Sequence, residues 1–525
     1  MRKQPAPAPK QKYTPEQQYI HTGLKELRSK QPEDTEEKNT TQFDSMATYI
    51  IKQISKDYNP WDINSLTEDD VADDIVLQCG RYIRYCESGW MVWNAEDGCW
   101  KGEEKAESMV QWIVRHFGRI MLENATEERP DALKYARGLL NSSGINAVMT
   151  ILKRDKRIVM ARDQFDADPE VLNCKGDLHN LRTGEVRPVE PEDYITKSMF
   201  CKPAEMKEEK MPKLPKQFED FIMKVTSKEG QQRADLALWL LFYFGYSLTG
   251  ETAASIFINC YGGGQNGKSV LLKLMMDLWG DYAAPLHQDI VIENRFASPF
   301  LLSNLSGSRL GILADAGEGQ FNTKVMKELS TGEPIDAPVK FKKSFTLRSK
   351  LKMAIGTNHK ITLRNIGKDI KRRLRLVPFD YTVPDDEIVP KLEEKLLKEA
   401  PEILRFLMYC ARQYYNKGGG VKAFPVCQVI DEASKEYLES QDLVGRWVRD
   451  NTEEAPGNEE SVDDMYLNFR RWCEGEGIKK IMGKNKFGEH VFIHIKEKKH
   501  TNKGTNYLNI RLISSSPPLP DRGSG

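Results

Sequence analysis

A glycine-rich segment contains the residues with the clearest chemistry in this sequence. It reads Gly262-Gly-Gly-Gln-Asn-Gly-Lys-Ser269 and satisfies the pattern G-x-x-x-x-G-K-[ST]. Its glycines let successive backbone N–H groups turn toward phosphate oxygens, and the N-terminus of a following helix adds partial positive charge. We expect Lys268 to reach the β- and γ-phosphates of ATP and the Ser269 hydroxyl to hold Mg²⁺. The residues predicted to bind the nucleotide are Gly262, Gly263, Gly264, Gln265, Asn266, Gly267, Lys268, Ser269 and Val270.

Hydrolysis needs more than a phosphate cradle: a carboxylate for the metal, a polar group for the attacking water and a cation against the developing charge. The apolar run Arg309–Ala314 ends at Asp315, which we assign to the Mg²⁺ shell. Glu318 follows three residues later, and we predict that it orients or deprotonates water. The apolar run Lys352–Gly356 leads to Asn358, whose amide can hold the water against the γ-phosphate. Exposed loop carboxylates and a turn-forming asparagine are the alternative interpretations.

Two arginines supply candidate cations. Arg372 and Arg373 lie just before the apolar run Leu376–Phe379. Arginines are poor core residues, so a bidentate phosphate contact explains them better than a solvated face does. If either arginine acts in the site of a neighbouring subunit, the enzyme must be an oligomer.

Composition limits the classes to which the chain can belong. The 525 residues include 77 Lys and Arg against 77 Asp and Glu, which excludes a globally basic nucleic-acid coat protein. The longest apolar run, Leu236–Tyr246, is shorter than the roughly 20 residues that span a bilayer. Nine cysteines without a Cys-x-x-Cys pair favour reduced thiols. We therefore expect a multidomain, non-membrane protein of the cytoplasm, which is the host cytoplasm if a phage encodes it.

The elements that position the candidate residues follow from apolar periodicity. The glycine segment leaves a predicted strand at 254–260 and opens a predicted helix at 269–279. Further strands are predicted at 309–314 and 352–356. Strands that alternate with helices favour a parallel sheet covered on both faces, so the predicted fold class is α/β.

The flanking regions contain further predicted elements. We expect a helix at 69–85, an aromatic hairpin at 89–101 and a helix at 131–154. Near the C-terminus we expect two strands, at 491–496 and 506–513, joined by a basic turn.

The ordered motifs resemble those of superfamily-3 helicases, and more closely the phage, plasmid and poxvirus-type primase-helicases. The resemblance covers about residues 70–385. It implies an AAA+-like P-loop core that assembles as a homo-hexamer and threads DNA through its centre. The segments that carry the resemblance are Gly262–Ser269, Arg309–Asp315, Gly332–Ile335, Gly356–His359 and Arg372–Phe379, preceded by Phe165–Gly184, which is similar to the helicase-associated region upstream of that core.

The same resemblance implies a pore hairpin between the acidic motif and Asn358. Lys342 matches the basic position of that hairpin, and Lys340 and Lys343 add charge beside it, so all three are predicted to bind DNA. Composition supports this independently, because Phe321–Leu376 contains 15 Lys and Arg against 4 Asp and Glu.

A second basic region lies near the C-terminus, where Tyr466–Ile513 contains 11 Lys and Arg against 4 Asp and Glu. Helices followed by a two-stranded basic turn resemble a winged helix, which grips duplex or forked DNA. The predicted domains are 1–44 (disordered tail), 45–205 (α+β helicase-associated domain), 206–250 (linker and helical collar), 251–385 (superfamily-3 ATPase core), 386–427 (helical lid or connector), 428–513 (winged-helix-like domain) and 514–525 (tail).

Together these observations predict a ring-forming replicative DNA helicase that hydrolyses ATP with Mg²⁺, translocates on single-stranded DNA and unwinds forked DNA in phage or plasmid-type replication. A separate primase or polymerase is an expected partner. Three alternatives stay open: a primase-helicase that synthesises primers at Asp166 and Asp168, an origin-binding initiator that does not unwind, and an RNA-directed motor. For the Asp166/Asp168 pair we favour a capped turn over a metal site.

Overall fold

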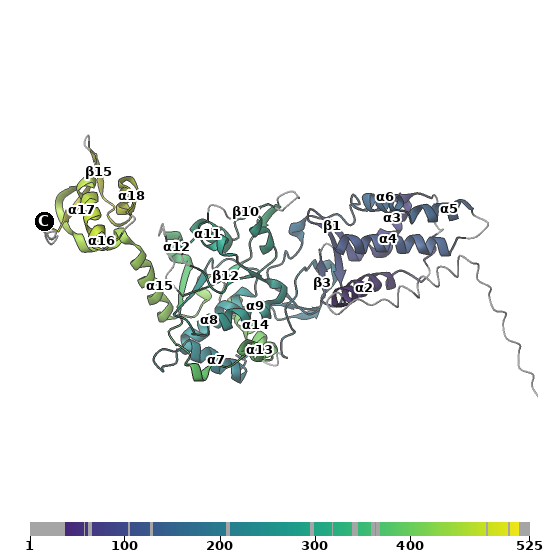
Figure 1. Cartoon of the computed structure of the whole chain (residues 1–525), viewed down its shortest axis with the longest axis horizontal. Coiled ribbons are helices and arrows are strands. Elements are labelled where there is room, and N and C mark those ends of the chain that lie inside the picture. Colours follow the sequence, from purple (N-terminus) through teal and green to yellow (C-terminus); the bar gives the residue numbers. More distant parts are fainter. Residues whose placement is uncertain are drawn as a thin grey trace, which may run out of the picture. The chain divides into compact units, whose positions relative to one another are not determined.

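The structure is a computed structural model that forms two compact units, Met1–Gln164 and Phe165–Gly525, described separately here (Figure 1). The boundary predicted at residue 205 differs from this division, because residues 165–205 belong to the second unit. The residues that the structure describes are 37–56, 58–60, 66–102, 105–125, 130–205, 210–294, 299–317, 319–338, 345–358, 363, 368–478, 481–501 and 504–513.

The first unit combines helices with a three-stranded antiparallel sheet of order β1-β2-β3. The predicted aromatic hairpin is confirmed: Trp93 of β2 pairs with Trp100 of β3, and their ring centroids are 5.8 Å apart. The elements of this unit are α2 (Glu37–Lys52), α3 (Glu68–Cys79), β1 (Ile83–Cys86), β2 (Gly89–Asn94), β3 (Cys99–Lys101), α4 (Lys105–Glu123), α5 (Pro130–Leu139) and α6 (Ser142–Leu152).

Two helices predicted in this unit are longer than the helices that the structure contains. The helix expected at 69–85 ends at Cys79, because residues 83–86 pair with β2 and gain cross-strand contacts instead. The helix expected at 131–154 is broken between α5 and α6. Gly144 permits the close approach of these helices, since a Cβ there would lie 2.7 Å from the Gly138 carbonyl oxygen.

The second unit is built on a five-stranded sheet of order β13-β7-β12-β9-β8 in which all neighbours are parallel. In the central strand, Ala354 lies between Ile258 and Ile312 of its two neighbours. The predicted α/β fold with a parallel sheet is therefore confirmed. The strands are β7 (Phe257–Tyr261), β8 (Ala283–Pro285), β9 (Leu310–Leu313), β12 (Lys352–Thr357) and β13 (Leu374–Pro378).

Helices cover both faces of this sheet. Because side chains alternate along a strand, Ala354 contributes to a core shared with α8, α9 and α14, whereas Met353 and Ile355 contribute to a second core with α11 and α15. The helices of this part are α7 (Lys216–Val225), α8 (Ala234–Ser247), α9 (Lys268–Trp279), α10 (Gln288–Val291), α11 (Thr323–Thr331), α12 (Lys368–Arg373), α13 (Leu392–Leu397), α14 (Ala400–Asn416) and α15 (Gln428–Gln441).

Residues 165–205 contain a small antiparallel sheet, β4 (Val171–Cys174), β5 (Asp177–Asn180) and β6 (Val186–Pro188). Buried cations join this segment to the large sheet. Arg309, which is 1 % exposed, donates to the Val171 carbonyl at 2.8 Å, and Lys350 donates to the carbonyls of Asp166 and Ala167. The segment is thus part of the ATPase-like core rather than of the preceding domain.

The C-terminal part contains α16 (Leu443–Asn451), β14 (Thr452–Ser461), α17 (Val462–Gly475), α18 (Lys484–His494), β15 (Lys498–Thr501) and β16 (Gly504–Leu512), with a sheet of order β14-β16-β15. The strand predicted at 491–496 is wrong, because α18 extends to His494. Phe487 and Val491, four residues apart, bury the same helical face against Trp447. The strand predicted at 506–513 is confirmed within β16.

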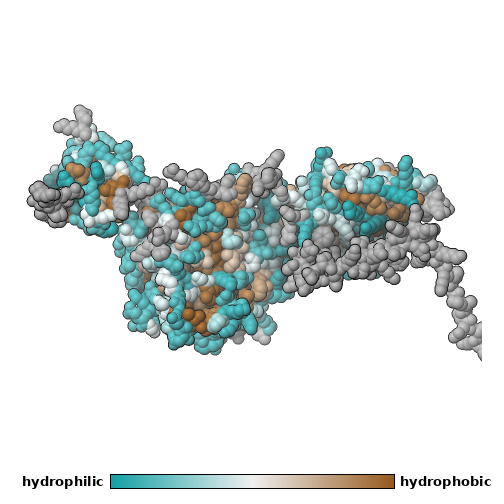
Figure 2. Space-filling view, in the orientation of Figure 1, coloured by the Kyte–Doolittle hydropathy of each residue, from teal (hydrophilic) through white to brown (hydrophobic). Residues whose placement is uncertain are grey.

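A short hairpin, β10 (Pro334–Ala337) and β11 (Phe345–Arg348), lies where the sequence predicts one between the acidic motif and Asn358. Among the described residues, no helix combines the length and the apolar character that crossing a membrane would require. The face drawn in Figure 2 carries patches of hydrophobic residues between mainly hydrophilic ones.

Candidate active site

The glycine segment connects the end of β7 to the start of α9, as predicted. Gly262 must be a glycine, because a Cβ there would lie 2.3 Å from the Phe379 carbonyl oxygen. Gly267 has a left-handed φ of 78°, and its Cβ would lie 2.4 Å from the Val225 side chain of α7. By contrast, a Cβ at Gly263 or Gly264 would meet nothing within 4 Å. The two ends of the loop are therefore held by packing, and its tip is open to a ligand.

Lys268 is the best-connected residue of the loop. Its ammonium donates to the carbonyls of Gly262 (2.8 Å) and Gly263 (2.9 Å) and to the side-chain oxygens of Asn266 (2.8 Å) and Asn358 (3.1 Å). Burial lowers the pKa of Lys268, and the negative charge of Asp315 acts in the opposite direction. The cation is thus held in the loop by neutral oxygens, with a carboxylate close enough to act on it.

The carboxyl ends of neighbouring parallel strands bring the other candidates to the same edge of the sheet. Asn358 follows β12, and Asp315 follows β9; both are exposed. The two strand ends are tightly packed, since a Cβ at Gly356 would lie 2.2 Å from the Ala314 carbonyl oxygen. A buried hydrogen bond of 2.9 Å from Thr357 to Asn259 fixes the end of β12 against β7.

The donors at this edge are suited to Mg²⁺, which favours oxygen ligands and takes one or two protein groups alongside substrate phosphates. Ser269 offers a hydroxyl in the first turn of α9, and Asp315 offers a carboxylate; both side chains are exposed. The described residues contain no cluster of three or more potential metal ligands. The arrangement therefore fits a metal held jointly by the protein and a triphosphate.

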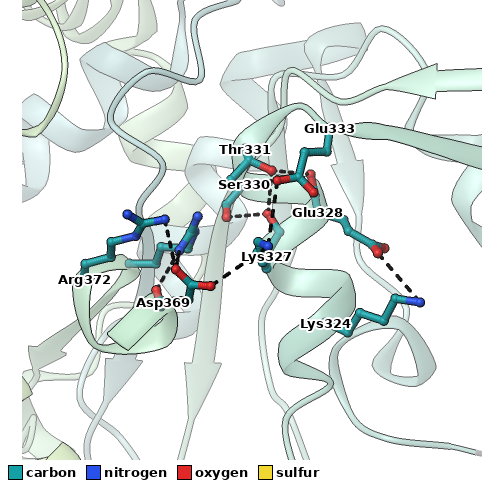
Figure 3. A network of polar contacts seen from close by, with 9 residues as sticks. Lys324, Lys327, Glu328, Ser330, Thr331, Glu333, Asp369 and Arg372 are labelled. Carbon is teal, nitrogen blue, oxygen red and sulfur yellow. Dashed lines mark hydrogen bonds and ion pairs between the residues drawn. The ribbon is translucent and has the colours of Figure 1, made fainter. Parts of the chain in front are cut away.

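The two candidate arginines have different environments (Figure 3). Both lie in the last turn of α12 and contact Asp369: Arg372 at 3.0 Å and Arg373 at 3.4 Å. The Arg372 side chain is 65 % exposed, whereas that of Arg373 is 3 % exposed and also donates to the Asp369 carbonyl at 2.8 Å. Arginines are poor core residues in general, but the structure buries Arg373.

Several predicted residues lie outside the described part of the chain. These are Glu318 and the three hairpin lysines Lys340, Lys342 and Lys343. The flanks of the hairpin are described: Ala337 pairs with Phe345 at the end of β10 and β11.

A segment that the sequence did not single out covers the phosphate loop. The backbone N–H of Val383 donates to the Gln265 carbonyl at 2.7 Å, and the Gln265 side chain donates to Asp385 at 2.6 Å. Glu387 of the same segment pairs with Lys224 of α7. These contacts join residues more than 100 positions apart, so no local sequence pattern predicts them.

Part of the positive charge predicted to face DNA is buried. Lys352 lies in the core, donates to the Thr249 and Glu251 carbonyls, and has a pKa far below its usual value because burial disfavours its charged form. Burial also lowers the pKa of Lys350 to about 8. Together with Arg373, these lysines account for three of the 15 cations between residues 321 and 376.

Asp166 has a structural environment rather than a catalytic one. Its carboxylate is buried and accepts hydrogen bonds from the Thr196 backbone (2.7 Å) and hydroxyl (2.5 Å). Asp168 accepts from the Glu170 backbone at 2.8 Å. The Asp168 contact is of the capped-turn type, whereas the Asp166 contacts are tertiary, because Thr196 lies 30 residues away.

Two family models match the chain. One, described as "D5 N terminal like", matches residues 74–226, and the other, described as "Family of unknown function (DUF5906)", matches residues 260–373. The second range contains the whole phosphate loop, Asp315, Asn358 and both candidate arginines.

Viral proteins are among the relatives. A protein of Acanthamoeba polyphaga mimivirus named as a "putative helicase" is 24% identical over 331 residues, which are 59% of this chain and 33% of the relative. A protein of African swine fever virus named as a "putative primase" is 22% identical over 259 residues, which are 45% of this chain and 27% of the relative. The chain thus spans a third or less of the length of these relatives.

Among solved structures, the apo C-terminal region of NrS-1 is similar with a TM-score of 0.42 and 10% identity, over 70% of this chain and 90% of that one. The resemblance expected from the ordered motifs is confirmed by the two family matches and the two viral relatives. The chain thus carries a D5 N-terminal-like region at residues 74–226 and is similar to viral proteins named as a putative helicase and a putative primase.

Proposed function

We propose that this protein is an ATP- and Mg²⁺-dependent DNA helicase that acts as a ring in viral or phage-type DNA replication. The observation that carries the proposal is the contact between Lys268 and Asn358, at 3.1 Å. It joins the phosphate loop to the end of the neighbouring strand, where a water attacking the γ-phosphate would be held. The similarity to a viral protein named as a putative helicase supports the choice of a helicase among P-loop enzymes.

In the proposed mechanism each residue has one task. Lys268 leaves the loop carbonyls and binds the β- and γ-phosphates, while Asn358 orients the attacking water. Ser269 and Asp315 would hold Mg²⁺, which supplies positive charge to the phosphate oxygens when bound. Arg372 of a neighbouring subunit stabilises the charge that develops on the γ-phosphate. Its exposure favours it over the buried Arg373.

The DNA contacts of the proposal come from two regions. We infer that residues 339–344, between β10 and β11, line a central pore, with Lys340, Lys342 and Lys343 touching the phosphate backbone.

The C-terminal part supports a winged-helix interpretation. Its order of elements is helix, strand, two helices and a two-stranded wing, and β16 lies between β14 and β15.

The ATPase part of the proposal is tested with Lys268→Ala. We expect this variant to lose ATP turnover, because the phosphates lose their central cation. Lys273→Ala is the matched control, since Lys273 lies on the same helix with its side chain 58 % exposed and pairs with Glu393. Steady-state phosphate release with and without single-stranded DNA is the measurement, and wild-type-like turnover by Lys268→Ala would contradict the assignment.

The primase alternative finds no support in the environment of Asp166 and Asp168, because the Asp166 carboxylate is buried against Thr196 and that of Asp168 caps a turn. Primer synthesis from nucleotides on a bare template would nevertheless reveal such an activity directly.

A further inference from the structure

A chain of charged side chains connects the arginine helix α12 to the hairpin β10–β11 (Figure 3). Asp369 contacts Arg372 through one carboxylate oxygen and approaches Lys327 of α11 at 4.0 Å through the other. Lys327 in turn lies 3.9 Å from Glu333, the residue directly before β10. The chain Arg372–Asp369–Lys327–Glu333 therefore runs from α12 across α11 to the residue that precedes β10.

The junction between α11 and β10 is short and rigid. Only Gly332 and Glu333 separate the two elements, and Gly332 has a left-handed φ of 73°. Hydroxyls of Ser330 and Thr331 hold the last turn of α11 by donating to the Lys327 carbonyl at 2.9 and 3.0 Å. A displacement at Lys327 or Glu333 is therefore passed to β10 rather than absorbed by a loop.

The ion pairs themselves are weak enough to exchange. The side chains of Lys327, Glu333, Asp369 and Arg372 are between 40 % and 65 % exposed. Exposed pairs of this kind are worth about 0–1 kcal/mol each, so a phosphate can compete with Asp369 for Arg372. When Arg372 leaves, the carboxylate of Asp369 has one cation fewer, and its attraction for Lys327 grows relative to that of Glu333.

We propose that Lys327 is a positioning residue that passes the nucleotide state from Arg372 to the β10–β11 hairpin by exchanging between Glu333 and Asp369. The proposal rests on the function proposed above, in which Arg372 faces the ATP of a neighbouring subunit and the hairpin contacts DNA. The relay adds the residues that link ATP binding at Arg372 to DNA contact at the hairpin. Lys327 touches neither ATP nor DNA in this scheme, so its loss should uncouple them.

The test compares Lys327→Met with Lys324→Met. Lys324 lies on the same helix, is 83 % exposed and pairs with Glu328 at 3.9 Å, so it controls for loss of a surface charge on α11. We expect Lys327→Met to keep its basal ATPase within about twofold and to lose at least about fivefold in fork unwinding per ATP hydrolysed. Lys324→Met should match the wild type in both measurements, and Lys327→Arg should restore coupling because it keeps the charge.

A double-mutant cycle separates a relay from a structural role. Glu333→Gln should show the same uncoupling, and Lys327→Met/Glu333→Gln should be no worse than either single variant, because both remove one link. Melting temperatures close to the wild type would show that all variants fold.

Unwinding per ATP in Lys327→Met equal to that of Lys324→Met would overturn the relay. So would loss of basal ATPase in Lys327→Met, which would place this lysine in the active site. A wild-type protein whose ATPase ignores DNA is a distinguishable result: it would refute the proposed function itself, and the relay with it.

Discussion

At the scale of single residues, the structure separates two arginines that are adjacent in sequence. Arg373 is buried, and its Nε has no hydrogen-bond partner among the described residues, while its Nη1 is held at the carbonyl and the carboxylate of Asp369. Arg372 is exposed and makes a single ion pair. An exposed guanidinium can reach the active site of a neighbouring subunit, whereas a buried guanidinium stabilises the fold of the subunit that contains it. We therefore assign different roles to the two residues.

This assignment predicts different defects for the two alanine variants. Arg372→Ala should lose ATPase but keep its melting temperature, and mixing it with Lys268→Ala subunits should restore part of the activity, because some interfaces then contain an intact site. Arg373→Ala should instead lower the melting temperature, since it removes a buried side chain. Mixed rings that are confirmed but recover no activity would contradict a shared site.

At the scale of elements, the strand, loop and helix around residues 257–279 were predictable because their sequence pattern is local. An apolar strand is followed by a glycine-rich loop and then by a helix. The segment 380–387, which covers the phosphate loop, was not predictable, because its contacts to Gln265 and Lys224 depend on the folded sheet. The strand expected at 491–496 failed for a similar reason. Its apolar residues suit a strand or a helix, and burial of Val491 in the same core as Phe487 and Trp447 favours the helix.

Another element-scale feature is Asp442, which joins α16, α18 and α12. Its carboxylate accepts from the Gly445 backbone at 2.9 Å, pairs with His494 at 3.2 Å and lies 3.6 Å from Lys371. Burial alone would raise the pKa of Asp442, but these three partners lower it to about 2. The folded protein thus favours the ionised form more than the unfolded chain does.

A pH-dependent stability follows from this pKa. Asp442 should stabilise the fold fully above about pH 4, by up to about 2 kcal/mol, and progressively less as the pH falls toward 2. Asp442→Asn keeps an N-capping side chain but removes the charge, so it isolates this contribution. Urea unfolding of both proteins at pH 5 and pH 3 measures it. A destabilisation by Asp442→Asn that is as large at pH 3 as at pH 5 would refute the assignment.

At the scale of the whole molecule, the proposed function requires more than one chain. The phosphate loop and Arg372 must come from different subunits, so activity should depend on assembly. We expect particle images of the protein with an ATP analogue and forked DNA to show closed rings, and dilution below the assembly concentration to abolish ATPase. A monomer that hydrolyses ATP at a rate independent of its concentration and of DNA would exclude a ring motor. Competition between DNA and RNA for ATPase stimulation would distinguish the RNA-directed alternative.

The cations that join residues 165–205 to the large sheet also determine where the chain can be divided. A fragment beginning at residue 206 would leave Arg309 and Lys350 without the carbonyls of Val171, Asp166 and Ala167, so charged groups would face a solvent-exposed gap in the core. A fragment beginning near 165 keeps all of these acceptors. Any exchange of domains between related proteins would therefore have to carry residues 165–205 together with the ATPase-like core.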